Sequence, residues 1–312
     1  MFKTFKIWDS LRYIIILSIG LFIVTINIPS NSIILPQTDN IKRIFTFWEP
    51  HQKIPGYLRL CIKTWKKVLP EYEIIILDYN NIKYYIEEPI LSNILCKKMS
   101  LKIQSDAIRV AILKTFGGLW LDLDTILLNK QFLFGFNNYD LVMFGSQKEK
   151  QQHIGFIYST KNCSIMNDWL EGITRNVKIY KKFLNNNRNI NDSGLKNFFR
   201  KKYSWNYLGN GIIDLILKNT TNKHFLRLDK YKMNIFPEIK NLDNISFNHR
   251  YKYNNFYFRK GDPKIIINES KGIILLHNSW TPNKFKKMSE KRFIKQDIIL
   301  SKLFAQILEP NL

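Results

Sequence analysis

One uninterrupted stretch, residues 105–128, constrains the fold of this chain more than any other. Its first half carries apolar residues at spacings of three and four, which predicts a helix. Asp106 and Arg109 are three positions apart, so they would project from one face of that helix. The Gly-Gly pair at 117–118 should end the helix, because glycine readily adopts the left-handed backbone found at many helix C-termini.

The second half of the stretch alternates as a strand does. The leucines would lie on one face, with Trp120, Asp122 and Asp124 on the other, and residues 126–128 should be buried. Two carboxylates this close disfavour each other's ionisation, and a divalent cation removes that conflict. Mg²⁺ and Mn²⁺ prefer oxygen and often bind one or two carboxylates together with substrate phosphates. Two solvated aspartates at a strand end are the alternative.

The sequence S-D-A-I-R, followed after seven residues by G-G-L-W-L-D-L-D, resembles the core of the DXD sugar-nucleotide glycosyltransferases. It is most similar to the capsular polysaccharide synthesis glycosyltransferases, and more distantly to the family-32 mannosyltransferases and the clostridial glucosylating toxins. The resemblance extends over roughly residues 41–289. It implies the GT-A fold, an α/β fold with a single mixed sheet flanked by helices.

The resemblance also implies roles for the residues of the motif. Asp124 should bind Mn²⁺ or Mg²⁺, and Asp122 should contact the ribose or sugar of the donor, or the metal. Asp106 and Arg109 should hold the donor's sugar hydroxyls and orient its leaving group. We therefore expect Asp122, Asp124 and Arg109 to carry catalysis. A purely structural ion pair between Asp106 and Arg109 is the alternative for those two residues.

Two earlier strands add candidates. The pattern predicts strands at 43–48 and 73–77 with a helix from Pro55 between them. This order is typical of an α/β sheet, which binds ligands at the carboxyl ends of its strands. Trp48 and Asp78 stand at such ends. By the resemblance Trp48 would stack on the nucleotide base. Asp78, by its place at a strand end, would contact the nucleoside. The alternatives are a core tryptophan and an aspartate that only begins a loop.

A last strand is predicted at 272–276, and a short polar and aromatic segment follows it: His277, Asn278, Ser279 and Trp280. Mg²⁺ or Mn²⁺ takes about six oxygens, so two aspartates leave the cation short of ligands. A similar segment in the glucosylating toxins reaches the metal and the diphosphate. By that resemblance His277, Asn278 and Ser279 are candidate metal ligands, and Trp280 would cover the donor.

Residues 11–28 are apolar with few exceptions and approach the roughly 20 residues that a membrane-spanning helix needs. Basic residues precede this run and none follows until Lys42, so the N-terminus should stay cytoplasmic. We expect an N-terminal hydrophobic helix that anchors the protein (1–30), a linker (31–41) and a GT-A domain (42–312). The alternatives are an in-plane surface helix and a strand-rich N-terminal extension. The protein would be a Golgi type II protein if eukaryotic, or an inner-membrane protein if bacterial.

Within the domain we expect a donor-binding half (42–145), an acceptor-side region (146–270) and a closing segment (271–312). Three further patterns concern the second half of the chain. The sequence predicts a polar surface excursion at 178–202, strands and loops at 225–257, and one basic amphipathic helix at 288–308.

The formal net charge of +23 indicates an anionic partner. The sequence has no nucleic-acid-binding signature, so we expect no nucleic acid. The expected partners are a nucleotide-sugar donor, a glycan or lipid-linked acceptor, and a membrane. A UDP-sugar is the expected donor, with a GDP-sugar as the alternative. The predicted reaction is sugar transfer, with retention of configuration as in the similar enzymes. The rival is a non-catalytic, membrane-anchored carbohydrate-binding protein that retains the fold, and the intact D-L-D argues against it.

Overall fold

The computed structural model describes most of the chain. The described residues are 42–146, 151–186, 206–219, 224–238 and 249–309. Within them, no helix is long and apolar enough to cross a membrane. The predicted anchor at 11–28 and the linker at 31–41 lie outside the described residues, so both stay predictions.

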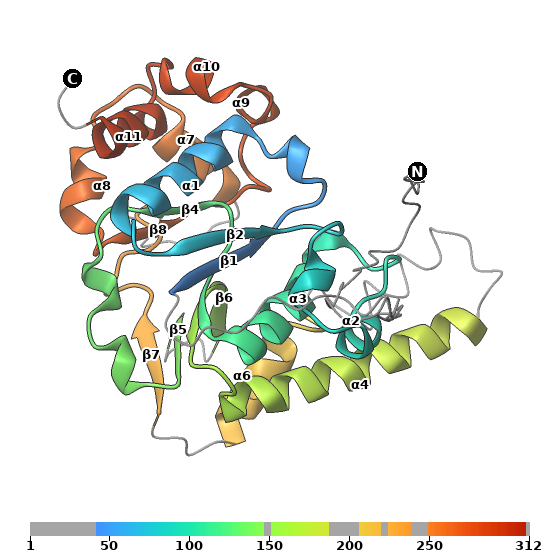
Figure 1. Cartoon of the computed structure of the whole chain (residues 1–312). Helices are drawn as coiled ribbons and strands as arrows, with labels where there is room; N and C mark the ends of the chain where they lie inside the picture. Colours follow the sequence, from blue (N-terminus) through green and yellow to red (C-terminus); the bar gives the residue numbers. More distant parts are fainter. Residues whose placement is uncertain (1–41, 147–150, 187–205, 220–223, 239–248, 310–312) are drawn as a thin grey trace, which may run out of the picture.

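A six-stranded mixed sheet forms the centre of the molecule (Figure 1). Its strands are β1 Arg43–Phe47, β2 Glu73–Leu77, β3 Gly118–Leu121, β5 Leu141–Ser146, β6 Gln151–Ser159 and β7 Phe225–Asp229. Their order across the sheet is β2-β1-β3-β6-β5-β7. β1 runs parallel to β2 and β3, β6 pairs antiparallel with β3 and β5, and β7 is parallel to β5. The predicted α/β class with a central mixed sheet is confirmed.

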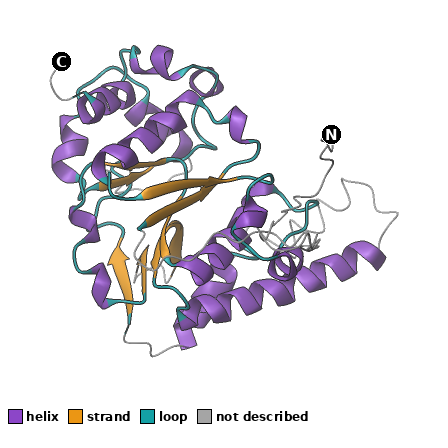
Figure 2. Ribbon diagram, viewed as in Figure 1, coloured by secondary structure: helices purple, strands orange, loops and turns teal. Residues whose placement is uncertain are grey.

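Helices cover both faces of this sheet (Figure 2). One face packs against α2 Glu88–Ile94, α3 Leu101–Phe116, α4 Ser164–Asn186 and α6 Asn210–Asn219. The other packs against α1 Gly56–Val68, α7 His249–Tyr257, α8 Lys264–Glu269, α9 Asn283–Lys286, α10 Glu290–Ile294 and α11 Ile299–Leu308. Two hydrophobic cores result, one on each side of the sheet.

Alternation along the strands supplies both cores. In β1, Ile44 packs on the α1 side and Phe45 on the α3 side; in β3, Leu119 and Trp120 divide in the same way. All four side chains are fully buried. Burial of one such side chain stabilises the fold by about 1.5–3 kcal/mol, so the period-two pattern determines how β1 and β3 sit between the helices.

The aspartates of the D-L-D sequence do not share one strand face, and this part of the prediction is wrong. β3 ends at Leu121, and the amide of Thr125 donates to the carbonyl oxygen of Asp122 at 3.0 Å, which closes a turn. The chain then leaves the central sheet. β4 Thr125–Leu127 pairs antiparallel with β8 Ile273–Leu275 in a second, two-stranded sheet. The prediction of a single sheet therefore missed the element that separates the two carboxylates.

Three predictions for the second half of the chain also need correction. α4 continues to Asn186, through the start of the predicted surface excursion, because its buried face repeats as far as Tyr180. The region predicted as strands and loops contains β7 but also α7, which buries Tyr253 and Tyr257 one turn apart. The predicted closing helix is interrupted at Ile298, whose extended backbone separates α10 from α11.

Candidate active site

Arg109 on α3 joins two of the predicted carboxylates. Its Nη2 lies 3.0 Å from Asp106 Oδ1 and 3.3 Å from Asp122 Oδ1. Its Nη1 donates to the carbonyl oxygen of Ile154 on β6, and its Nε to that of Ser105 at 3.3 Å. Since Arg109 and Asp106 are both buried, this guanidinium is fixed by α3, β6 and the end of β3 together.

Trp120 also holds the carboxylate of Asp122. Its Nε1 donates to Asp122 Oδ1 at 2.9 Å, and the Arg109 guanidinium lies over its ring at 5.0 Å from the centroid. The Asp122 side chain is 37% exposed, whereas that of Arg109 is 4% exposed. Asp122 therefore has one oxygen fixed by buried donors, while its partly exposed side chain leaves Oδ2 available to a ligand.

Two glycines that the sequence analysis did not assign to the site let backbone approach these carboxylates. A Cβ on Gly155 would lie 2.9 Å from Asp122 Oδ2, and one on Gly209 would lie 2.9 Å from Asp106 Oδ2. Either distance is too short for a real contact. Gly209 lies in a Gly-Asn-Gly sequence, a turn signal that marks the position but not its proximity to Asp106.

Burial is the main reason that Asp106 is an unusually weak acid. It raises the pKa of this carboxyl to about 7, the negative charge of Asp122 acts in the same direction, and the Arg109 guanidinium opposes both. The site therefore carries a carboxyl group that binds a proton near neutral pH, although an arginine lies 3.0 Å away.

This property predicts how stability depends on pH. The folded state holds the Asp106 proton to higher pH than the unfolded state, whose carboxyl has a pKa of about 3.9. The contribution of Asp106 to stability should therefore fall as pH rises from about 4 to about 7. We expect the free energy of unfolding of the Asp106→Asn variant, measured in urea, to fall less over that interval than that of the wild type. Parallel slopes for the two proteins would contradict the assignment.

Asp124 lies at the junction of the two sheets, beside the segment that follows β8. The amide of Leu276 donates to the Asp124 carbonyl oxygen at 2.8 Å, and the amide of Asn278 donates to Asp124 Oδ2 at 2.7 Å. The Tyr57 hydroxyl, from α1, donates to Asn278 Oδ1. A contact between residues more than 150 positions apart thus follows from the β4–β8 pairing.

The Asp124 carboxyl has a pKa raised to about 6. Burial is the first cause and the charge of Asp122 the second, while the Asn278 amide and His277 act in the opposite direction. Burial likewise raises the pKa of the neighbouring Tyr57 hydroxyl and Cys61 thiol, and the charge of Asp124 adds to both shifts. A carboxylate in such surroundings gains from a nearby cation.

The aspartates fit a hard divalent cation in part. Among the described residues, no other residue hydrogen-bonds Asp122 Oδ2 or Asp124 Oδ1, and carboxylate oxygens suit Mg²⁺ and Mn²⁺. The described residues contain no group of three or more His, Cys, Asp or Glu side chains that could hold a metal ion. Ser279 is exposed, and Asn278 contacts Asp124 through its backbone.

His277 and Trp280 belong to an aromatic cluster beside Asn278. The two rings lie 3.9 Å apart, and His277 stacks on Phe236 at 5.2 Å. His277 Nε2 lies 3.5 Å from the buried Glu238 Oε1, and within the described chain neither atom has a hydrogen bond. The imidazole nitrogen that was predicted to bind a metal is thus adjacent to Glu238, which no motif in the sequence marks as a site residue.

His153 on β6 is a further polar residue that the sequence analysis missed. Its Nδ1 accepts the Gly155 amide at 3.3 Å, and its ring lies edge-on to Phe236 at 5.2 Å. Burial lowers its pKa to about 4, so the ring is neutral at pH 7 with its proton on Nε2. A neutral donor of this kind suits a sugar hydroxyl.

Trp48 and Asp78 lie at the carboxyl ends of β1 and β2, as predicted. The Trp48 amide donates to the Leu77 carbonyl oxygen at 3.0 Å, and its half-buried ring packs against the core on the α1 side. Asp78 Oδ1 accepts the amides of Asn80 and Asn81, both at 2.9 Å, which stabilises a local turn. These two hydrogen bonds use one of the two carboxylate oxygens of Asp78.

Comparison with known proteins identifies the family. Residues 27–261 match the family model described as "Capsular polysaccharide synthesis protein". The chain belongs to this family. Membership confirms the resemblance found in the motif, and with it the prediction of an enzyme, a glycosyltransferase. No curated protein sequence matches the chain.

Solved structures give distant likenesses only. The PaToxG glycosyltransferase is 18% identical over 57% of this chain and 68% of that one, with a TM-score of 0.39. A glycosyltransferase involved in glycosylation of the major capsid of PBCV-1 is 12% identical over 79% and 98%, at 0.39. GlyE of Streptococcus pneumoniae TIGR4 is 11% identical over 86% and 64%, at 0.41. At these TM-scores the family model alone carries the assignment to the capsular polysaccharide synthesis family.

Proposed function

We propose that this member of the capsular polysaccharide synthesis family is a metal-dependent glycosyltransferase of the GT-A type. It moves a sugar from a nucleotide-diphospho-sugar to a glycan or lipid-linked acceptor, with retention of configuration. One observation carries the proposal: Asp124, whose ionised form is disfavoured by burial and by Asp122, is fixed by the Asn278 amide at the junction of two sheets. Such a carboxylate is suited to a cation and a diphosphate.

Asp124 and Asp122 would hold Mn²⁺ or Mg²⁺ through the carboxylate oxygens that no other described residue hydrogen-bonds. When bound, the cation would act as a Lewis acid that stabilises the charge of the departing diphosphate. His277, Asn278 and Ser279 are the further metal ligands that we propose.

The remaining residues of the site bind and orient the donor. Arg109 fixes Asp122 and presents positive charge, and the neutral form of Asp106 donates a hydrogen bond to a sugar hydroxyl. Trp48 stacks on the base, Asp78 contacts the nucleoside through its remaining oxygen, and Trp280 covers the donor. Retention is assigned to front-face transfer, since Asp122 is already bound by buried donors and is a poor nucleophile.

Hydrolysis of a panel of UDP- and GDP-sugars, without acceptor and with Mn²⁺, tests the proposal. We expect turnover of at least one donor, and its loss on chelation. His277→Ala and Trp280→Ala in the same assay test the closing segment. Absence of hydrolysis for every donor, together with binding of the sugars alone, would favour a carbohydrate-binding protein instead.

The proposal includes a membrane anchor at residues 11–28, which rests on the apolar run and the basic residues before it. The full chain should stay with membranes in alkaline carbonate, because that treatment removes proteins held only at the surface. Release into the soluble fraction would exclude a spanning helix.

A further inference from the structure

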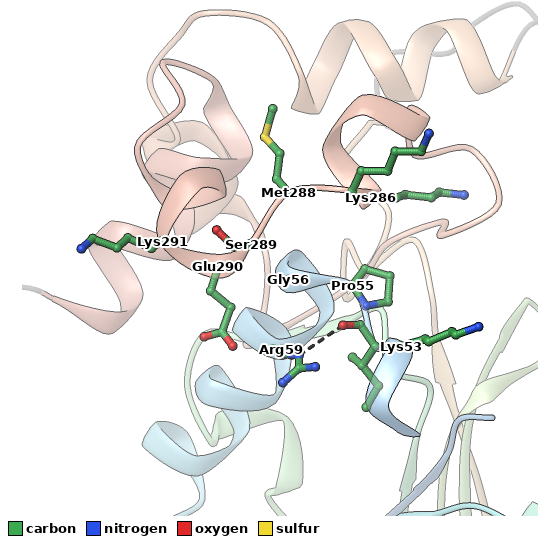
Figure 3. Close-up of a pocket in the computed structure, with 11 residues that line it drawn as sticks. Lys53, Pro55, Gly56, Arg59, Lys286, Met288, Ser289, Glu290 and Lys291 are labelled. Atoms are coloured by element: carbon green, nitrogen blue, oxygen red, sulfur yellow. Dashed lines mark hydrogen bonds between the residues drawn. The ribbon is translucent and has the colours of Figure 1, made fainter. Parts of the chain in front are cut away.

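A groove of about 540 Å³ lies between the start of α1 and the residues that join α9 to α10. Figure 3 shows its two walls, with Lys53 and Arg59 on one side and the segment from Lys286 to Lys291 on the other. Five basic residues line it: Lys53, Arg59, Lys286, Lys287 and Lys291. Nothing in the proposed donor site uses them.

The positive charge of this basic groove is not neutralised within the described residues. Glu290 is the one acidic residue in its lining, and it pairs with Lys63, which lies outside the lining. Among the described residues, none of the five cations forms an ion pair with a carboxylate. Since clefts concentrate the field of the charges along them, the groove attracts anions more strongly than scattered surface lysines would.

Part of the groove is held rigid. The Arg59 guanidinium donates to the carbonyl oxygens of Ile54 at 3.1 Å and Gln52 at 3.3 Å, which fixes its position before any ligand arrives. A Cβ on Gly56 would lie 2.5 Å from the Met288 carbonyl oxygen, so only glycine lets the two walls meet at this depth. Fixed donors lose little entropy on binding an oxyanion.

The groove adjoins the candidate active site. Tyr57, the residue after Gly56, donates to Asn278, whose amide binds Asp124. Lys286 is close enough to Asp124 for that carboxylate to raise the pKa of its amine, although burial, the larger effect, lowers it. These hydrogen bonds therefore link the wall of the groove to the candidate active site.

We propose that the basic groove binds anionic groups, phosphate or carboxylate, carried by the acceptor glycan. This inference rests on the proposed function, which places the diphosphate of the donor at Asp124 and leaves the groove for a second anion. Lysine and arginine recognise both kinds of oxyanion. The two walls suit a chain that lies between them better than the flat surface of a bilayer.

The test measures binding of the full chain, in detergent, to fluorescein-labelled oligogalacturonate, a labelled glycerol-phosphate oligomer and a neutral dextran oligomer. Lys287→Glu combined with Lys291→Glu reverses two groove charges. Lys98→Glu combined with Lys182→Glu makes the same charge change at exposed positions before α3 and on α4, which Figure 1 shows far from α10. Thermal unfolding verifies that each variant folds.

We expect the groove variant to bind one or both anionic oligomers at least about 10-fold more weakly than the wild type does. The control should change by less than about 3-fold, and the dextran should not bind at the groove. Equal loss in both variants, or loss in neither, would overturn the proposal. Inorganic phosphate that displaces the oligomers at equal concentration would assign the groove to free phosphate and overturn it too.

Two further measurements separate this inference from the proposed function. Binding of UDP or GDP with Mn²⁺ should be the same in wild type and groove variant, and its loss in the variant would assign the groove to the donor. If the wild type binds the oligomers but hydrolyses no donor, the proposed function is refuted, while the assignment of the groove to anionic groups is not. Loss of binding to phosphatidylglycerol vesicles, with oligomer binding kept, would make the groove a membrane contact and refute its assignment to a glycan.

Discussion

Asp124→Asn is expected to lower donor turnover by at least about 10³-fold while the protein stays folded. The amide oxygen of asparagine still accepts the Asn278 amide, so the link between the D-L-D turn and the segment after β8 survives. What the variant lacks is the negative charge. Burial raises the pKa of Asp124 to about 6, so its ionisation is less favourable in the folded apo protein than in the unfolded chain. The variant should therefore unfold at an equal or higher temperature in EDTA.

The matched control is Asp297→Asn, which removes an exposed carboxylate that pairs with Lys260 and Lys302. Its turnover should equal that of wild type. EDTA should reproduce the effect of Asp124→Asn in the wild-type protein, and added Mn²⁺ or Mg²⁺ should restore only the wild type. A variant that keeps more than a tenth of wild-type turnover would rule out Asp124 as the metal ligand.

The helices and strands near the site could be predicted because their apolar residues follow the spacing of a single kind of secondary structure. The apolar spacing before Gly117 predicts α3, and the glycine itself ends that helix with a φ of 68°. β2 was predicted with its observed bounds, since Glu73–Leu77 is a short apolar run before a turn. These features depend on neighbours in the sequence, so the sequence alone contains the information.

The error at D-L-D has the opposite cause. Alternation places Asp122 and Asp124 on one face only if the strand continues, and no Gly, Pro or Asn marks the turn between them. What bends the chain is the pairing of β4 with β8, about 150 residues later, which no local pattern reveals. Gly155 and Gly209 were missed for the same reason, because their contacts with Asp122 and Asp106 exist only in the folded chain.

Arg109→Met should lower the free energy of unfolding by about 1–3 kcal/mol, the usual effect of leaving buried hydrogen-bonding groups without their partner. Methionine has a similar length, so the change removes mainly charge and hydrogen bonds. Asp106 would remain buried without its cation, and Asp122 would keep only Trp120 as a donor on Oδ1. Turnover should fall by about 10²- to 10³-fold, since Asp122 would no longer be fixed. Urea unfolding and donor hydrolysis measure the two effects.

A double variant separates charge from packing. Asp106→Asn in the Arg109→Met background removes the unpaired carboxyl, so stability should recover by more than about 1 kcal/mol, while turnover should stay low. The control is Arg175→Met on the exposed side of α4, which should change stability by less than about 0.5 kcal/mol. If Arg109→Met were as stable as this control, the ion pair would contribute nothing to the fold. If the double variant regained turnover, Arg109 would act only by neutralising Asp106, and its proposed contact with the donor would be wrong.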